Sequence, residues 1–169
     1  MLVKPSERYK KSYLGAFKES GITEGDLNIM MPGKGETFKA FVRRLLDNSQ
    51  GLRIKRGWVP STTFWLVNED KFIGRLSIRH SLNKKVRREA GHIGYFIRPS
   101  ERKRGYGKLI LTLGLKEARK LGLTKTLITC DVGNIASKKI IEFHGGKFKN
   151  KVSGKKGTLD KLRYWIDIR

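Results

Sequence analysis

The chain of 169 residues is long enough to bury a substantial core, and its 38% hydrophobic and 9% aromatic residues predict a globular fold rather than disorder. We expect one domain covering residues 1–169. A run of 18 apolar residues is absent and the basic N-terminus lacks an apolar core, so neither a membrane-spanning helix nor a signal peptide is expected. The single cysteine, Cys130, leaves no partner for an intrachain disulfide and favours a reducing, cytoplasmic environment.

The charge is strongly positive, with 38 Lys and Arg residues against 15 Asp and Glu residues and a formal net charge of +23. This excess is far beyond what solubility requires. It indicates either a polyanionic partner, such as RNA, a ribosome or an acidic substrate, or a surface property without a specific partner. Two basic stretches, at residues 84–88 and 147–156, are predicted on loops.

Periodicity predicts the order of the elements. Helices are expected where apolar residues recur every three or four positions, and strands where apolar, β-branched and aromatic residues alternate or run together. In chain order we predict helices at 6–20 and 36–49, strands at 63–67, 71–79 and 91–97, a helix at 105–121, a strand at 126–131, a helix at 134–144, and strands at 147–152 and 162–168, with connectors at 25–35, 51–60 and 81–88.

This order predicts an α/β layered domain. Strands 91–97 and 126–131 are joined by a helix, so they are expected to be parallel neighbours. A ligand is then expected at their carboxyl ends.

The stretch from Arg102 to Lys108 links a predicted strand to a predicted helix and contains Gly105 and Gly107. Unpaired backbone N–H groups and the positive end of the helix dipole meet at such a turn, and glycines let a ligand approach the backbone. The turn therefore suits a phosphate or pyrophosphate, although a basic loop whose glycines relieve strain gives the same pattern. The pattern fits neither the dinucleotide-binding fingerprint nor the P-loop.

Two motifs resemble a known family. Arg102-x-x-Gly105-x-Gly107 after a strand is similar to the acetyl-CoA signature of the GNAT superfamily of N-acetyltransferases. The segment beginning Asn134-x-x-Ser137 resembles the family's second signature, in which an Asn opens a helix. The resemblance covers roughly residues 60–168 and implies a mixed central sheet of six to seven strands, two N-terminal helices and two later helices, with strands 91–97 and 126–131 splayed apart around the pantetheine arm of acetyl-CoA.

The resemblance also implies roles in holding acetyl-CoA. Backbone groups of one strand would pair with the pantetheine arm, and backbone N–H groups of the turn would hold the pyrophosphate. Asn134 would contact the cofactor, or would act only as a helix cap. The implied cofactor-binding residues are Tyr95, Phe96, Ile97, Arg102, Lys103, Arg104, Gly105, Tyr106, Gly107, Lys108 and Asn134.

Three residues are candidates for acid–base chemistry. The family often has a Tyr acid where this chain has Ile141, so Ser137 is the candidate acid, with a locally satisfied hydroxyl as the alternative. Glu89 is the candidate base, because strand alternation would place it on the same face as Gly91 and Tyr95. Asp131 is the second candidate base, and a turn-forming role is its alternative.

The remaining titratable groups are expected to be structural. His92 is predicted as a packed histidine, His144 as a helix-end residue and Cys130 as buried packing. Cys, His and carboxylate residues show no metal-ligand spacing.

Two functions remain in view. One is direct transfer of an acetyl group from acetyl-CoA to a primary amine of an unidentified acceptor that is acidic or associated with nucleic acid. The other is an inactive GNAT-like module that binds RNA or the ribosome through its charge. The sequence leaves monomer and homodimer open.

Overall fold

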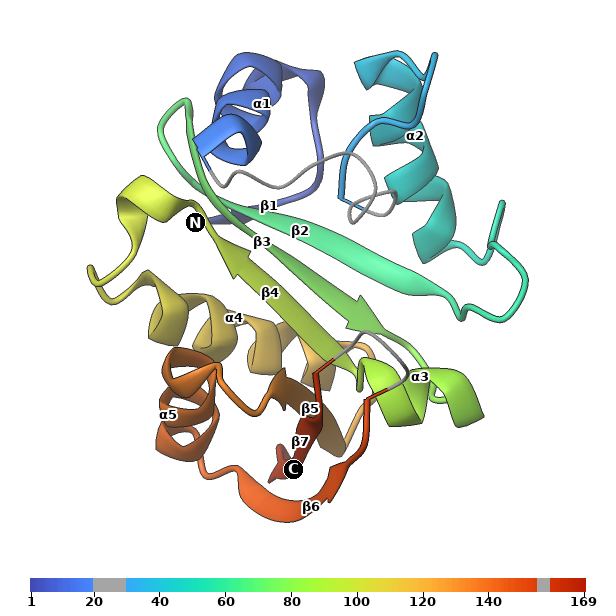
Figure 1. The fold of residues 1–169 in the computed structure, drawn as a ribbon. Helices are drawn as coiled ribbons and strands as arrows, with labels where there is room; N and C mark the ends of the chain where they lie inside the picture. The colour runs from blue at the N-terminus through green and yellow to red at the C-terminus, as the bar shows by residue number, and fades with distance from the viewer. Residues whose placement is uncertain (20–29, 155–158) are drawn as a thin grey trace.

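A computed structural model describes residues 1–19, 30–154 and 159–169. Its sheet has seven strands in the order β1-β2-β3-β4-β5-β7-β6, and Figure 1 shows helices on both sides of it. The strands are β1 (Leu2–Val3), β2 (Ser61–Asn68), β3 (Lys71–Arg79), β4 (Ile93–Ile97), β5 (Lys125–Asp131), β6 (Lys147–Val152) and β7 (Lys161–Asp167). The helices in the described ranges are α1 (Lys10–Glu19), α2 (Phe38–Ser49), α3 (Lys84–Glu89), α4 (Tyr106–Lys120) and α5 (Ile135–Phe143).

The sheet separates two hydrophobic cores. Helices α1 and α2 cover one face and α4 and α5 cover the other (Figure 1). On the first face Tyr13 is fully buried and contacts Trp65 and Phe72, with ring centroids 4.5 and 4.7 Å away. On the second face Leu76 and Ile78 of β3 pack in the core formed with α4. Strand alternation thus sends neighbouring side chains of β3 into different cores.

Strand β4 is joined to β5 only at its own beginning, where it meets the middle of β5. They are parallel and their single register pair is Ile93 with Ile128. Just before it, the His92 N–H donates to Leu127 O at 2.6 Å, and the Leu127 N–H donates to His92 Nδ1 at 2.9 Å. Gly91 also lies against β5, where a Cβ atom would come within 2.4 Å of Leu127 O. Beyond this point the ladder stops, which gives the splayed pair that we expected.

The α/β fold class with a mixed sheet is confirmed, and antiparallel pairing holds for every other neighbouring pair. The predicted helices and strands all occur, with ends shifted by a few residues. The first helix is preceded by a 3-10 turn at Glu7–Tyr9, and the short edge strand β1 was not predicted. The end of the predicted helix 6–20 and the first part of the loop 25–35, residues 25–29, lie outside the described residues.

The prediction of a polar loop at 81–88 is wrong, because these residues contain helix α3. Asn83 caps it by accepting a hydrogen bond from the Val86 N–H at 2.9 Å. The helix ends before Gly91, whose φ of +64° favours glycine. The strand predicted from residue 91 therefore begins at Ile93. The basic residues at 84–88 accordingly lie on a helix, and those at 147–151 lie on β6, rather than on loops. Lys155 and Lys156 of the second stretch lie outside the described residues.

Candidate functional site

The turn between β4 and α4 forms a cradle of backbone donors. Lys103 has φ of +61° and Gly105 has φ of +83°, and Gly105 is the residue that caps α4. Within the described residues, the backbone N–H groups of Lys103 to Gly107 have no hydrogen-bond partner, whereas the Lys108 N–H donates to Gly105 O at 3.1 Å. Consecutive free N–H groups at a helix N-terminus bind anions. The cradle, residues 103–107, is thus suited to a phosphate or pyrophosphate group.

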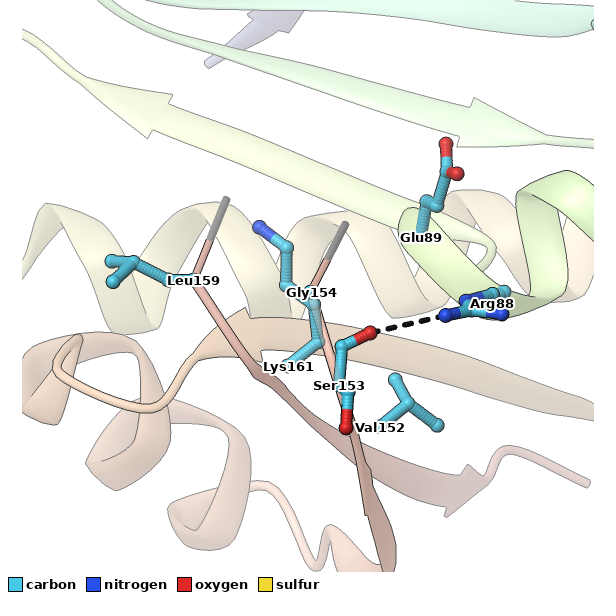
Figure 2. Close-up of a pocket in the computed structure, with 7 residues that line it drawn as sticks. All are labelled: Arg88, Glu89, Val152, Ser153, Gly154, Leu159 and Lys161. Atoms are coloured by element: carbon cyan, nitrogen blue, oxygen red, sulfur yellow. Dashed lines mark hydrogen bonds between the residues drawn. The ribbon is translucent and has the colours of Figure 1, made fainter. Parts of the chain in front are cut away.

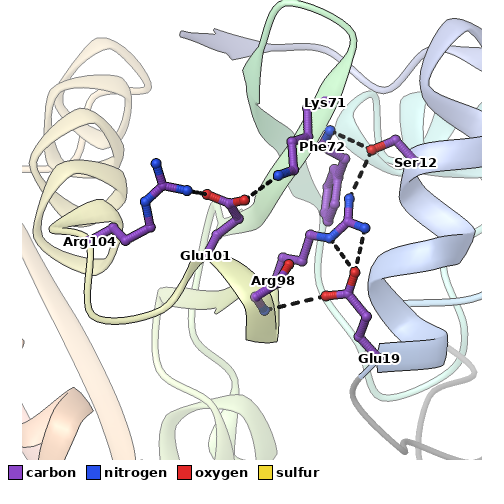
Figure 3. Close-up of polar contacts among 8 residues, drawn as sticks. Ser12, Glu19, Lys71, Phe72, Arg98, Glu101 and Arg104 are labelled. Atoms are coloured by element: carbon purple, nitrogen blue, oxygen red, sulfur yellow. Dashed lines mark hydrogen bonds and ion pairs between the residues drawn. The ribbon is translucent and has the colours of Figure 1, made fainter.

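A buried carboxylate fixes the base of this turn. Glu101 is 2% exposed and pairs with Lys71 of β3 and with Arg104, whose Nη1 lies 2.7 Å from Glu101 Oε2 (Figure 3). The hydrogen bond from Lys71, stronger in effect than burial, lowers the pKa of Glu101. The carboxylate therefore stays charged and ties the turn to the sheet.

A second ion pair fixes the start of the turn to helix α1. Arg98 Nε lies 2.8 Å from Glu19 Oε1, and Arg98 Nη1 donates to Ser12 Oγ at 3.1 Å (Figure 3). The Ser12 hydroxyl in turn accepts the Phe72 N–H at 2.9 Å. The hydrogen bond from Arg98 lowers the pKa of Glu19 to about 2. The two networks tie the turn to strand β3 and to helix α1.

The cations of the turn differ in what they contact. Arg102 Nε donates to Ile97 O at 3.2 Å, at the end of β4, and Arg104 is partly neutralised by Glu101. Lys108 Nζ lies 3.7 Å from the ring centroid of Phe143 on α5. Lys103 is exposed and has no ion pair among the described residues. The turn therefore keeps an uncompensated positive charge next to its free N–H groups.

The two glycines of the turn have different tasks. A Cβ atom at Gly105 would meet no atom within 4 Å, so this glycine leaves the cradle open. A Cβ atom at Gly107 would lie 2.6 Å from Ile140 Cδ1, so this glycine allows α4 to approach α5. The expectation that both glycines clear a path for the ligand stays a prediction, and at Gly107 the missing side chain also makes room for Ile140 of α5.

A cavity of about 140 Å³ lies where β4 and β5 separate. We call it the β4–β5 cleft. It is lined by Ile93, Gly94, Tyr95, Thr129, Cys130, Asp131, Asn134, Ser137 and Lys161. The cleft thus brings together the sequence candidates Tyr95, Asp131, Asn134 and Ser137. Along its β4 side, Tyr95, Phe96 and Ile97 pair with β3 but have no ladder partner on β5.

Two hydroxyl groups meet in the cleft. Tyr95 Oη and Ser137 Oγ lie 2.9 Å apart, and either group can donate. Burial raises the pKa of Tyr95 to about 12, although the hydrogen bond with Ser137 acts in the opposite direction. The tyrosine hydroxyl is therefore neutral at physiological pH. The sequence predicted only a backbone role for Tyr95 and no role for its hydroxyl. The available signal was strand alternation, which places Tyr95 on the same face as the buried Ile93.

Asn134 is the N-cap of α5. Its Oδ1 accepts the Ser137 N–H at 3.0 Å, so this oxygen acts as a helix cap, which was one of the two roles considered for Asn134. The Asn134 amide nitrogen has no hydrogen-bond partner in the described part of the chain. It remains available to a ligand carbonyl.

Asp131, at the end of β5, forms an ion pair with Lys161 of β7. The contact gives this carboxylate a structural partner across the edge of the cleft. Its neighbour Cys130 is buried, and burial is the main cause that raises the pKa of the thiol. A buried thiol of raised pKa is a poor nucleophile, as predicted for a packing residue.

Glu89 does not lie on a strand. It is the last residue of α3, so the alternation argument that placed it beside Tyr95 is wrong. Its backbone oxygen accepts a hydrogen bond from Thr129 Oγ1 at 3.3 Å. Its side chain lines a separate cavity of about 270 Å³, shown in Figure 2 with Arg88, Val152, Ser153, Gly154, Leu159 and Lys161. Lys161 lines this cavity and the β4–β5 cleft, so the two adjoin.

The remaining candidates are structural. His92 is 7% exposed and its Nδ1 accepts a backbone hydrogen bond, which confirms a packed histidine. Burial, followed by the charges of Arg87 and Arg79, lowers its pKa to about 4. His144 caps the end of α5, with Nε2 2.8 Å from Thr112 Oγ1. Over residues 1–19, 30–154 and 159–169, no cluster of metal-ligating side chains and no helix able to span a membrane is found.

Solved structures share this fold at low sequence identity. The Salmonella typhimurium putative acetyltransferase yncA, solved with acetyl-CoA, is 12% identical with a TM-score of 0.65, over 100% of this chain and 94% of that one. An N-acetyltransferase from Staphylococcus aureus Mu50 is 15% identical with a TM-score of 0.68, over 100% and 98%. The microcin C7 self-immunity acetyltransferase MccE, solved with acetyl-CoA and AMP, is 14% identical with a TM-score of 0.71, over 98% and 91%.

Comparison with curated proteins found no similar sequence. The model of the acetyltransferase (GNAT) domain family, in contrast, matches residues 29–147, which include the cradle and most of the β4–β5 cleft. The expectation of a GNAT acetyltransferase is therefore confirmed at the level of the family, and the chain belongs to the acetyltransferase (GNAT) domain family.

Proposed function

We propose that the protein transfers the acetyl group of acetyl-CoA directly to a primary amine. The observation that carries this proposal is the free backbone of residues 103–107 at one end of the β4–β5 cleft, with the Tyr95–Ser137 hydroxyl pair at its wall. The pyrophosphate fits the cradle, because it would satisfy unpaired N–H groups beside an uncompensated positive charge. The pantetheine arm fits the unpaired edge of β4, because Tyr95 to Ile97 have no ladder partner on the β5 side.

The chemistry requires two bond events, C–N formation and C–S cleavage, and two proton transfers. The neutral amine nitrogen attacks the thioester carbonyl carbon, the C–S bond breaks, and the nitrogen loses a proton. The departing thiolate needs a proton, and the Ser137 hydroxyl donates it in our proposal, with Tyr95 hydrogen-bonded behind it. Ile141, which occupies the place of the family's frequent Tyr acid, is fully buried in the core and contributes no proton.

Two carboxylates are candidates for the general base that accepts the proton of the amine. Asp131 lines the cleft, but its carboxylate is ion-paired with Lys161. Glu89 reaches the adjoining cavity. We therefore keep Glu89 as the first candidate and propose that the acceptor amine enters through that cavity, where Lys161 separates it from the cleft.

The test is acetyl-CoA binding by titration calorimetry with a matched pair of glycine variants. Gly105→Asp places a carboxylate at the open cradle and should weaken binding more than tenfold, or about 1.4 kcal/mol. Gly122→Asp is the control, because Gly122 has a similar φ of +82°, open space around its Cβ position and a place at the far end of α4. Asp tolerates this backbone conformation better than most residues.

Equal affinity of the two folded variants would contradict the assignment of the cradle. Absence of acetyl-CoA binding by the unmodified protein would leave the non-enzymatic module as the better description. If acetyl-CoA binds, release of free thiol in the presence of peptide and RNA-bound amines tests the transfer itself.

A further inference from the structure

Two arginines of the central strand β3 lie on the sheet face that carries α1 and α2, and neither pairs with a carboxylate among the described residues. Arg75 and Arg79 alternate with Leu76 and Ile78, which face the opposite core, so both guanidinium groups lie on the α1/α2 face. Arg75 is 6% exposed, and Arg79 is half-buried. Within the described residues, neither side chain forms an ion pair, and each guanidinium contacts only neutral oxygen atoms.

The donors of these side chains are largely unused. Arg75 donates from Nη2 to Thr63 Oγ1 at 3.5 Å, and its buried Nε has no partner in residues 1–19, 30–154 and 159–169. Arg79 donates only from Nη1, to Gly91 O at 3.2 Å and Ala90 O at 3.5 Å. A guanidinium carries five N–H donors in a fixed fork, so most of the capacity of both groups is free within the described part of the chain.

Burying charged groups without a counter-ion is costly, which makes this pair unusual. Burial and the charge of Arg75 lower the pKa of Arg79 to about 10, and burial is also the main cause that lowers the pKa of Arg75. A negatively charged ligand would remove both penalties at once. An internal structural role explains the two Arg79 contacts to backbone carbonyls but not the unpaired charge of Arg75.

The pair adjoins the proposed reaction centre. Ser77, between the two arginines, lies opposite Gly94 in the β3–β4 register, and Gly94 lines the β4–β5 cleft. Arg79 Nη1 is 3.8 Å from the position that a Gly94 Cβ would occupy. Because Gly94 has no side chain, a ligand group in the cleft has a short path across β4 to the Arg79 guanidinium. The cradle for the pyrophosphate lies at the other end of β4, so this is a different set of donors.

We propose that Arg75 and Arg79 form an oxyanion-binding subsite that recognises a carboxylate or phosphate group of the acceptor. The forked donors of Arg79 bind the oxyanion directly, and Arg75 lies behind as the compensating charge. The acceptor is thus an amine that carries an anionic group near the nitrogen that is acetylated. The identification of the bound molecule as the acetyl acceptor rests on the proposed acetyl transfer. The oxyanion site itself does not depend on that proposal.

The test is a site-resolved titration. The Nε–H signals of arginine are followed by NMR while inorganic phosphate or succinate is added at constant ionic strength, with coenzyme A present to fill the cradle. We expect the signals of Arg75 and Arg79 to shift with saturation. Tighter binding of phosphate than of succinate indicates a phosphate-bearing acceptor, and the reverse order indicates a carboxylate-bearing one.

Variants separate binding at this site from general attraction to a basic protein. Arg79→Gln should weaken anion binding at least tenfold. Arg79→Lys keeps the charge but not the forked donors of a guanidinium, so its anion affinity should lie between those of Arg79→Gln and the unmodified protein. Arg87→Gln is the control, because it removes the same charge from an exposed position on the neighbouring helix α3. It should change the affinity less than twofold.

Equal losses for Arg79→Gln and Arg87→Gln, or shifts that follow ionic strength alone, would overturn the proposal. Acetyl-CoA affinity is measured on the same variants and should change less than twofold for Arg79→Gln. If acetyl-CoA does not bind at all, the proposed acetyl transfer fails, but the arginine signals still report whether the subsite binds an oxyanion. Thermal melting confirms that each variant is folded.

Discussion

Protonation of His92 should weaken the fold, because this ring joins β4 to β5 at the base of the cleft. Its Nδ1 accepts the Leu127 N–H at 2.9 Å, which requires the unprotonated nitrogen. Burial lowers the pKa of His92 to about 4. In the unfolded chain the ring titrates near its ordinary value of about 6.5.

The sign of the effect follows from proton linkage. Because the pKa of His92 is lowered in the folded state, the unfolded chain binds more protons between about pH 4 and 6.5. The contribution to stability is complete above pH 6.5 and is lost as the pH falls towards 4. For these two pKa values the loss between pH 8 and pH 5 is at most about 2 kcal/mol, and structural relaxation reduces it towards about 1 kcal/mol.

The assay compares urea unfolding at pH 8 and pH 5 for the unmodified protein and for His92→Asn. The Asn side-chain oxygen replaces the acceptor Nδ1 but does not titrate, so other groups contribute equally to both proteins. We expect the free energy of unfolding of the unmodified protein to fall by about 1 kcal/mol more than that of the variant. An NMR titration of His92 should give a midpoint below pH 5. Identical pH dependence of the two proteins, or a midpoint above 6, would refute the reasoning.

Three further predictions concern the candidate site. Ser137→Ala and Tyr95→Phe should each lower kcat, and the loss of a general acid in Ser137→Ala should lower it by about 100-fold. The acetyl-CoA affinity of both variants should change less than twofold. An unchanged kcat for both variants would show that the hydroxyl pair takes no part in the mechanism. Gly107→Ala should lower stability by about 1–3 kcal/mol through its contact with Ile140, and Ile140→Val in the same chain should restore part of it, as measured by urea unfolding; additive losses would contradict this contact. Glu89→Gln should reduce turnover mainly on the acidic side of the pH–rate profile, and a profile equal to that of the unmodified protein would move the base to Asp131 or to a neutral incoming amine.

The sequence by itself determined the order of most elements and the position of the turn whose backbone N–H groups are free within the described residues. Helical spacing from Tyr106 onwards, a preceding strand and Gly105 are local features, and local geometry is enough to leave N–H groups free at a helix N-terminus. Helix α3 could also have been predicted from the sequence, because Asn83 and Gly91 are typical residues for the start and the end of a helix. The charged composition of residues 84–88 led instead to the prediction of a loop.

Tertiary structure decided which side chains meet. Tyr95 and Ser137 are 42 positions apart, and their hydrogen bond depends on how far β4 and β5 diverge after Ile93. The direction of the Gly107 α-hydrogen depends on the packing of α4 on α5, which no local pattern encodes. Arg75 and Arg79 alternate with apolar residues as on an ordinary half-exposed strand. Only the assembled layers bury Arg75 and half-bury Arg79, because burial is a property of the tertiary packing rather than of the strand.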